Sequence, residues 1–191
     1  MNGVLSSQNR IVIVTGCSGG GKSSLCEALS ARGWSILQEA GRQIVREELA
    51  ANGTGLPWAD PVEFVKKAAT RHIEKLQNLL SSNVSGPIIT DRSLIDLISF
   101  LEMNGLKIPS TINDMLDDIS YHEEVLYVPP WRQIFNIDDE RSKSFAEAAT
   151  EHEATQDAYV RSGFRMTEIP RGSIAYRVDF VEAFGPLRTR K

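Results

Sequence analysis

The chain has 191 residues, of which 41% are hydrophobic and 24% charged, and its formal net charge is −4 at neutral pH. This length predicts one domain over residues 1–191, and the composition excludes a disordered, collagenous or coiled-coil chain. The acidic balance does not favour a nucleic-acid partner. No apolar run approaches the roughly 18 residues of a membrane span, and residues 1–9 lack an apolar signal core, so we expect a soluble, cytoplasmic protein.

Short apolar runs alternate with helical patterns along the chain. Strands are predicted at residues 10–15, 34–37, 87–91, 124–128 and 164–169. Helices are predicted at 22–32, 40–51, 61–80, 94–103, 111–119 and 174–184, because their apolar residues recur three and four apart. Parallel strands need crossover connections, and helices supply them. The alternation therefore predicts an α/β fold with a parallel sheet and helices on both faces.

A glycine-rich segment follows the first predicted strand and opens the first predicted helix. Its residues 16–23, GCSGGGKS, fit the pattern G-x-x-x-x-G-K-[ST] at every fixed position. Glycines let the backbone curl around a phosphate, and the N–H groups at a helix start favour an anion. The alternative is a glycine-rich turn with a chance Lys-Ser. The expected phosphate-binding residues are Gly16, Ser18, Gly19, Gly20, Gly21, Lys22, Ser23 and Ser24.

The same loop predicts roles for two of its side chains. Lys22 is placed to reach the β- and γ-phosphates of a nucleotide, and the Ser23 hydroxyl is placed to ligate Mg²⁺. Such a site also needs a carboxylate at the end of a neighbouring strand. Asp91 directly follows residues 88–90 and is the candidate second metal ligand. The alternative for Asp91 is a polar residue that simply ends a strand.

Two further candidates lie at strand ends. Glu39 follows residues 36–38 and could accept a proton from a substrate hydroxyl, or it could only stabilise the start of the next helix. Arg92 could contact a phosphate or the substrate, or form a surface ion pair. Ser93 and Asp96 have the spacing of a helix cap. The three histidines share no metal-ligand spacing and are interpreted as structural or surface residues.

Residues 131–157 are mostly charged and polar and lack apolar periodicity. We expect this segment to project into solvent as a lid-like insertion rather than to fill the core. Phosphoryl transfer calls for a closing element and for positive charge on the γ-phosphate. Arg132 and Arg141 are the candidate arginines. The alternative is an exposed, charged hairpin of helices.

These segments together resemble P-loop AAA-type domains of the ribosylnicotinamide-kinase-like group. The resemblance rests on GCSGGGKSS, QEAGRQIVREEL, LPWADPVEF, TDRSLIDLISFLEMNGL, VLYVPPW, the start of the lid-like segment DDERSKSF, and IPRGSIAYRVDFV. It implies a five-stranded parallel sheet of order 2-3-1-4-5, with ATP or GTP and Mg²⁺ bound. The chain also resembles deoxynucleoside kinases, in which a glutamate after the second strand is the base and an acid-Arg-Ser triplet follows the third. Those features correspond here to Glu39 and to Asp91-Arg92-Ser93.

The sequence supports a kinase that transfers the γ-phosphoryl group of ATP or GTP to a small-molecule acceptor with a nucleoside-like hydroxyl. In this hypothesis Lys22, Glu39, Asp91, Arg92, Arg132 and Arg141 carry the chemistry. The alternative is a nucleotide-dependent switch that hydrolyses slowly and contacts a protein partner. A nucleic-acid-associated ATPase is a third hypothesis, disfavoured by the acidic charge. The acceptor, the choice between ATP and GTP and the oligomeric state stay open.

Overall fold

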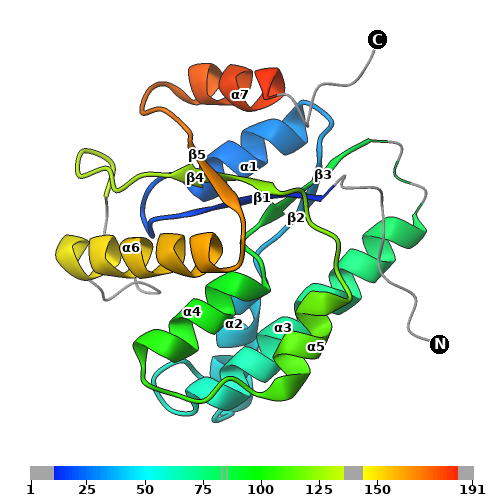
Figure 1. Ribbon diagram of the computed structural model, residues 1–191, viewed down its shortest axis with the longest axis vertical. Coiled ribbons are helices and arrows are strands. Elements are labelled where there is room, and N and C mark those ends of the chain that lie inside the picture. The colour runs from blue at the N-terminus through cyan, green and yellow to red at the C-terminus, as the bar shows by residue number, and fades with distance from the viewer. Residues whose placement is uncertain (1–10, 83, 85, 136–143, 185–191) are drawn as a thin grey trace.

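The computed structural model describes residues 11–82, 84, 86–135 and 144–184, and these form a five-stranded parallel sheet (Figure 1). The sheet has the order β2-β3-β1-β4-β5. The strands are β1 (Ile11–Gly16), β2 (Ser35–Leu37), β3 (Ile88–Asp91), β4 (Glu124–Val128) and β5 (Arg165–Glu168). The central strand β1 pairs with β3 on one side and with β4 on the other. The expected α/β class and strand order are confirmed.

Alternate residues of β1 face two different hydrophobic clusters. Val12 and Val14 join the cluster beneath α1 (Lys22–Ala31) and α7 (Ile174–Ala183). Ile11 and Ile13 join the larger cluster on the opposite face. All four side chains are fully buried, as expected for a strand that is covered by helices on both faces.

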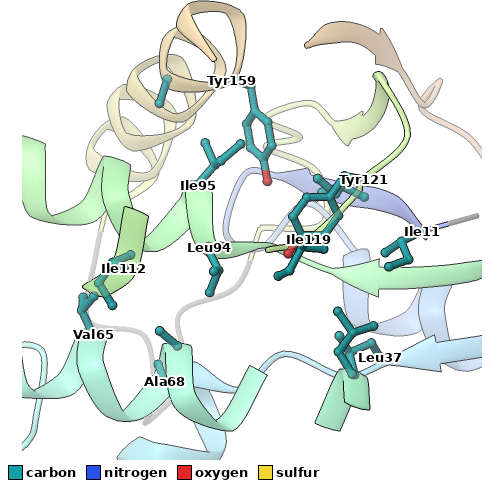
Figure 2. Packing of buried hydrophobic residues seen from close by; sticks show 14 of the residues in the cluster. Ile11, Leu37, Val65, Ala68, Leu94, Ile95, Ile112, Ile119, Tyr121 and Tyr159 are labelled. Atoms are coloured by element: carbon teal, nitrogen blue, oxygen red, sulfur yellow. The ribbon is translucent and has the colours of Figure 1, made fainter. Parts of the chain in front are cut away.

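The larger cluster is covered by the remaining helices, which lie together on the other side of the sheet (Figure 1). They are α2 (Gly41–Ala51), α3 (Pro61–Ser81), α4 (Leu94–Met103), α5 (Ser110–Asp117) and α6 (Phe145–Arg161). Figure 2 shows Tyr159 of α6 and Ile95 of α4 pointing into the same core as Tyr121. The Asp60 carboxylate caps α3 by accepting a hydrogen bond from the Glu63 N–H, as the sequence predicted.

Helix α6 corrects one expectation. From residue 145 onward the predicted lid-like segment is a helix that packs against α4 and buries Ala148, His152 and Thr155. The prediction that all of 131–157 projects into solvent is therefore wrong for this part. The side chains that α6 buries within this segment are small or polar, and they leave no aliphatic stripe in the sequence. Residues 136–143, including Arg141, lie outside the described part of the chain.

Within the described ranges, no helix combines the length and the apolar character required to cross a bilayer.

Candidate active site

The glycine-rich loop connects β1 to α1 and is tied to the end of β4. Gly16, Gly19 and Gly21 have φ angles of 121°, 77° and 79°, a region that favours glycine. At Gly16 a Cβ atom would lie 2.2 Å from the Val128 carbonyl oxygen. The Cys17 N–H donates to that same oxygen at 3.1 Å. Glycine is thus required at position 16 by both the backbone angle and the close approach of β4.

Lys22 is the first residue of α1 and is buried. Its Nζ donates to the Gly16 carbonyl at 3.3 Å, so the ammonium group lies across the loop. Burial and the nearby Arg92 lower the pKa of Lys22, while Asp91 and Glu39 oppose that shift. Ser23 and Ser24 follow in the first turn of α1. The loop, the lysine and the helix start are therefore arranged as the sequence predicted.

Asp91 ends β3, directly opposite Val14 of β1. Its side chain is buried, and its Oδ1 atom has no hydrogen-bond partner among the residues that the structure describes. Burial raises the pKa of Asp91, and the neighbouring Lys22 partly offsets this. Carboxylate and hydroxyl oxygens are the protein ligands that Mg²⁺ accepts, alongside several waters. The free carboxylate oxygen of Asp91 and the hydroxyl of Ser23 therefore fit the expected metal.

Arg92 lies between two carboxylates. Its Nη1 donates to Asp96 Oδ1 at 2.9 Å, and its Nε lies 3.4 Å from Glu39 Oε1. Burial opposes its charge, but Glu39 and Asp96 outweigh this effect and raise the pKa of Arg92 above its usual value. Its φ angle of 68° is uncommon for a residue other than glycine. Arg92 therefore forms ion pairs, as one of the two alternatives predicted, but its side chain is only 23% exposed, so these pairs are partly buried.

Asp96, one of the two carboxylates beside Arg92, is held by several hydrogen bonds. Its carboxylate accepts hydrogen bonds from Thr15 Oγ1 at 2.6 Å and from Tyr159 Oη at 2.5 Å. It also accepts from the Ser93 N–H at 2.9 Å, which completes the predicted capping box of α4. Burial opposes ionisation, but Arg92 and these hydrogen bonds hold the pKa of Asp96 below its usual value. One carboxylate thus connects β1, α4, α6 and Arg92.

A cavity of about 250 Å³ lies beside the loop. Its polar wall includes Glu39, Asp91 and Arg92, which the sequence had placed at strand ends. Its aromatic wall consists of Trp58, Phe64, Phe100 and Phe135. Trp58 is 67% exposed and therefore lies at the mouth. The cavity therefore has an apolar wall of aromatic rings next to the charged side chains at the strand ends.

Two cavity features were not found from the sequence. His72 was interpreted as structural or surface, yet it lines the cavity, with its Nε2 atom 3.0 Å from Tyr121 Oη. Phe135 covers the loop, because a Cβ atom on Gly19 would lie 2.6 Å from its ring. His72 has no neighbouring residue in the sequence with which it would form a recognisable site motif. Phe135 falls in a segment without apolar periodicity.

Of the two predicted lid arginines the structure describes Arg132, which does not line the cavity. Arg132 is exposed, and its guanidinium lies 5.3 Å from the centre of the Phe145 ring. Arg141 falls outside the described ranges. The structure instead brings Arg177 of α7 to the loop. This arginine is 1% exposed and donates to the carbonyls of Gly20 and Gly21 at 3.2 and 3.4 Å.

The strand–loop–helix unit, the loop lysine and the strand-end aspartate define a P-loop domain with the fold of the nucleotide-binding kinases. Residues 11–177 match the family model described as "AAA domain". The chain belongs to this family. A search of curated protein sequences found no match.

Solved structures with the same fold include small kinases. "NadR protein in complex with NR" superposes with a TM-score of 0.69 at 14% identity, covering 95% of this chain and 53% of that one. Deoxyadenosine kinase from M. mycoides with bound dATP gives 0.55 at 12% identity and covers 90% and 96%. Shikimate kinase from Acinetobacter baumannii gives 0.53 at 15% identity and covers 90% of each chain. These likenesses show a shared fold.

Proposed function

We propose that this protein is a Mg²⁺-dependent kinase that transfers the γ-phosphoryl group of ATP or GTP to a hydroxyl of a nucleoside-like acceptor. The observation that carries the proposal is the cavity of about 250 Å³ beside the P-loop. It joins a carboxylate and an arginine at one wall to aromatic rings at the other. A nucleotide switch needs no such pocket, whereas a kinase needs room for an acceptor next to the γ-phosphate.

On the donor side, the loop N–H groups and Lys22 hold the triphosphate. Ser23 and Asp91 would hold Mg²⁺, either directly or through water, and the bound ion would neutralise charge on the phosphate oxygens. Asp91 suits this role because its buried Oδ1 has no other partner. Arg132 is the candidate contact to the γ-phosphate from the segment after β4. Its guanidinium would have to leave the Phe145 ring, on which it lies now.

On the acceptor side, Glu39 accepts the proton of the attacking hydroxyl as its oxygen bonds to the γ-phosphorus, while the bond from that phosphorus to the bridging β-phosphate oxygen breaks and the nucleoside diphosphate leaves. Arg92 positions this carboxylate, since its Nε lies 3.4 Å from Glu39 Oε1. The rings of Trp58, Phe64 and Phe100 favour an acceptor with a flat, apolar group. A nucleoside-like molecule has both the ring and the hydroxyl. The fold of the M. mycoides deoxyadenosine kinase supports this class of acceptor.

We place the reaction in the cytoplasm. Cys17 and Cys26 are both buried free thiols, and unpaired cysteines suit a reducing compartment.

The test is to incubate the protein with Mg²⁺-ATP or Mg²⁺-GTP and a pool of nucleosides, and to look by mass spectrometry for an acceptor that gains a phosphate. We expect Lys22→Ala to abolish transfer. Glu39→Gln should lower turnover by about 10²–10⁴-fold, the usual contribution of a general base. Glu74→Gln is the matched control, because the Glu74 side chain is 59% exposed and forms no part of the cavity lining.

The outcomes separate the two hypotheses. A phosphorylated acceptor with the expected loss in Glu39→Gln supports the kinase. Nucleoside diphosphate release with no modified acceptor, and with turnover equal in Glu39→Gln and wild type, would overturn the kinase and favour the switch.

A further inference from the structure

Arg177 is an arginine buried beneath the phosphate loop and outside the acceptor cavity. It lies on α7, one of the two helices that cover the other face of the sheet. Its Nη2 donates to the Gly20 carbonyl and its Nη1 to the Gly21 carbonyl. On its other side the guanidinium lies 5.9 Å from the centre of the Trp131 ring. The planar guanidinium thus spans two consecutive peptide groups of the loop.

The charge of Arg177 has no counterion among the described residues. Arg92 is paired with Glu39 and Asp96, but no carboxylate of the described chain forms an ion pair with Arg177, and its buried Nε has no partner. The guanidinium also lies at the N-terminal end of α1, where the helix dipole is already positive. Burial lowers the pKa of Arg177, as expected for an uncompensated cation. A buried, unpaired cation in this place points to an anion that binds here.

The geometry of the two hydrogen bonds indicates what the arginine does. In a trans peptide the carbonyl of one residue and the N–H of the next point in opposite directions. Holding the carbonyls of Gly20 and Gly21 therefore turns the N–H groups of Gly21 and Lys22 to the opposite side of the loop. Those N–H groups belong to the part of the loop expected to bind phosphate.

We propose that Arg177 is a positioning residue of the nucleotide site, which fixes the N–H groups of Gly21 and Lys22 for a polyphosphate and has its own charge balanced by that polyphosphate when bound. It touches the loop and not the acceptor cavity. This inference rests on the donor half of the proposed function, polyphosphate binding by the loop. It does not depend on the identity of the acceptor.

The test uses inorganic tripolyphosphate with Mg²⁺ as the probe, with the Kd measured by titration calorimetry on the full chain. We expect Arg177→Met to raise the Kd by about tenfold or more, because the loop N–H groups lose the charge-assisted hydrogen bonds that fix them and the bound anion loses a nearby positive charge. Arg177→Lys keeps the positive charge but lacks the planar guanidinium that can donate to two carbonyls, and it should recover part of the affinity. Arg171→Met is the matched control: Arg171 precedes α7, is exposed and also donates to a carbonyl, that of Pro130.

Amide hydrogen exchange of the ligand-free protein gives a second readout. Peptides that cover residues 17–25 should exchange faster in both Arg177 variants and at the wild-type rate in Arg171→Met. The lysine variant serves if the methionine variant does not fold. The proposal is overturned if the folded variants bind tripolyphosphate within twofold of wild type and the amide exchange of residues 17–25 is unchanged. It is also overturned if the wild-type chain does not bind tripolyphosphate. If wild type binds tripolyphosphate and loses affinity in the Arg177 variants, while no acceptor is modified and Glu39→Gln turns over at the wild-type rate, the kinase is refuted and the inference on Arg177 stands.

Discussion

Replacing Asp96 by asparagine removes one charge from the most buried ion pair of the site and keeps the shape of the side chain. In the wild type, Arg92 Nη1 lies 2.9 Å from Asp96 Oδ1. The two carboxylate oxygens also accept from Thr15 Oγ1, Tyr159 Oη and the Ser93 N–H. Asparagine has a single acceptor oxygen, so its NH₂ group must face some of the groups that donate to the carboxylate in the wild type. Arg92 is left with Glu39 as its acidic partner.

The cost follows from these contacts. Breaking a buried pair by removing one partner costs about 3–5 kcal/mol, and the side chain of Asp96 is only 5% exposed. For a chain of this size, each kcal/mol lowers the Tm by about 2–4 °C, so the Tm should fall by roughly 6–20 °C. The pKa of folded Asp96 is below its usual value. Its contribution is therefore present above the unfolded pKa of about 3.9 and is lost as pH falls through the folded pKa.

Urea unfolding at pH 7 measures the loss, and a thermal scan gives the shift in Tm. Asp114→Asn, at an exposed position of α5, makes the same chemical change without a buried partner and should stay within about 0.5 kcal/mol of wild type. The difference between Asp96→Asn and wild type should shrink below pH of about 4. A loss below about 1 kcal/mol, or an equal loss in the control, would refute the assignment of Asp96 as the anchor of Arg92.

Three further changes have definite outcomes. Gly16→Ala puts a methyl group 2.2 Å from the Val128 oxygen and should cost more than about 3 kcal/mol in urea unfolding, whereas Gly86→Ala, with nothing within 4 Å, should cost less than about 1 kcal/mol. Burial lowers the pKa of His72 to about 4. The unfolded chain then binds more protons, so stability should fall as pH drops from about 6.5 towards 4, and less steeply in His72→Gln. Trp58→Ala should raise the KM of the acceptor about tenfold and leave the KM of the nucleotide and the Tm unchanged, because Trp58 is 67% exposed at the cavity mouth; equal shifts in both KM values would contradict this.

Local patterns predicted the sheet and the loop well. The run predicted at residues 10–15 corresponds to β1 (Ile11–Gly16), which is buried on both faces, and such strands are short, continuous and β-branched. The P-loop depends on consecutive residues, so its glycines, Lys22 and Ser23 can be identified from the sequence alone. Glu39 and Asp91 were found because parallel strands bring their carboxyl ends to one edge, and the structure places both at the same cavity.

Features that depend on contacts between distant segments were missed. Helix α6 packs through Ala148, His152 and Thr155, which carry no aliphatic signal. The position of Arg177 in the sequence does carry a signal. It lies three residues after Ile174 and four before Val181, on the apolar stripe of the last predicted helix. Its spacing placed a charge on a buried face, and only the fold shows that the charge meets the loop. Because its cation–carbonyl contacts join residues over 150 positions apart, no local pattern contains them.

The two ends of the described chain meet in one layer, since α1 and α7 cover the same face of the sheet (Figure 1). During synthesis the ribosome delivers α1 well before α7. The helices over the acceptor cavity can dock on β1, β3 and β4 before α7 emerges, but the layer beneath the phosphate loop cannot close. A nascent chain should therefore form the cavity beside the sheet first and complete the support of its phosphate loop only after α7 has emerged. Premature termination before α7 would yield a chain with an exposed apolar sheet face and an unsupported loop.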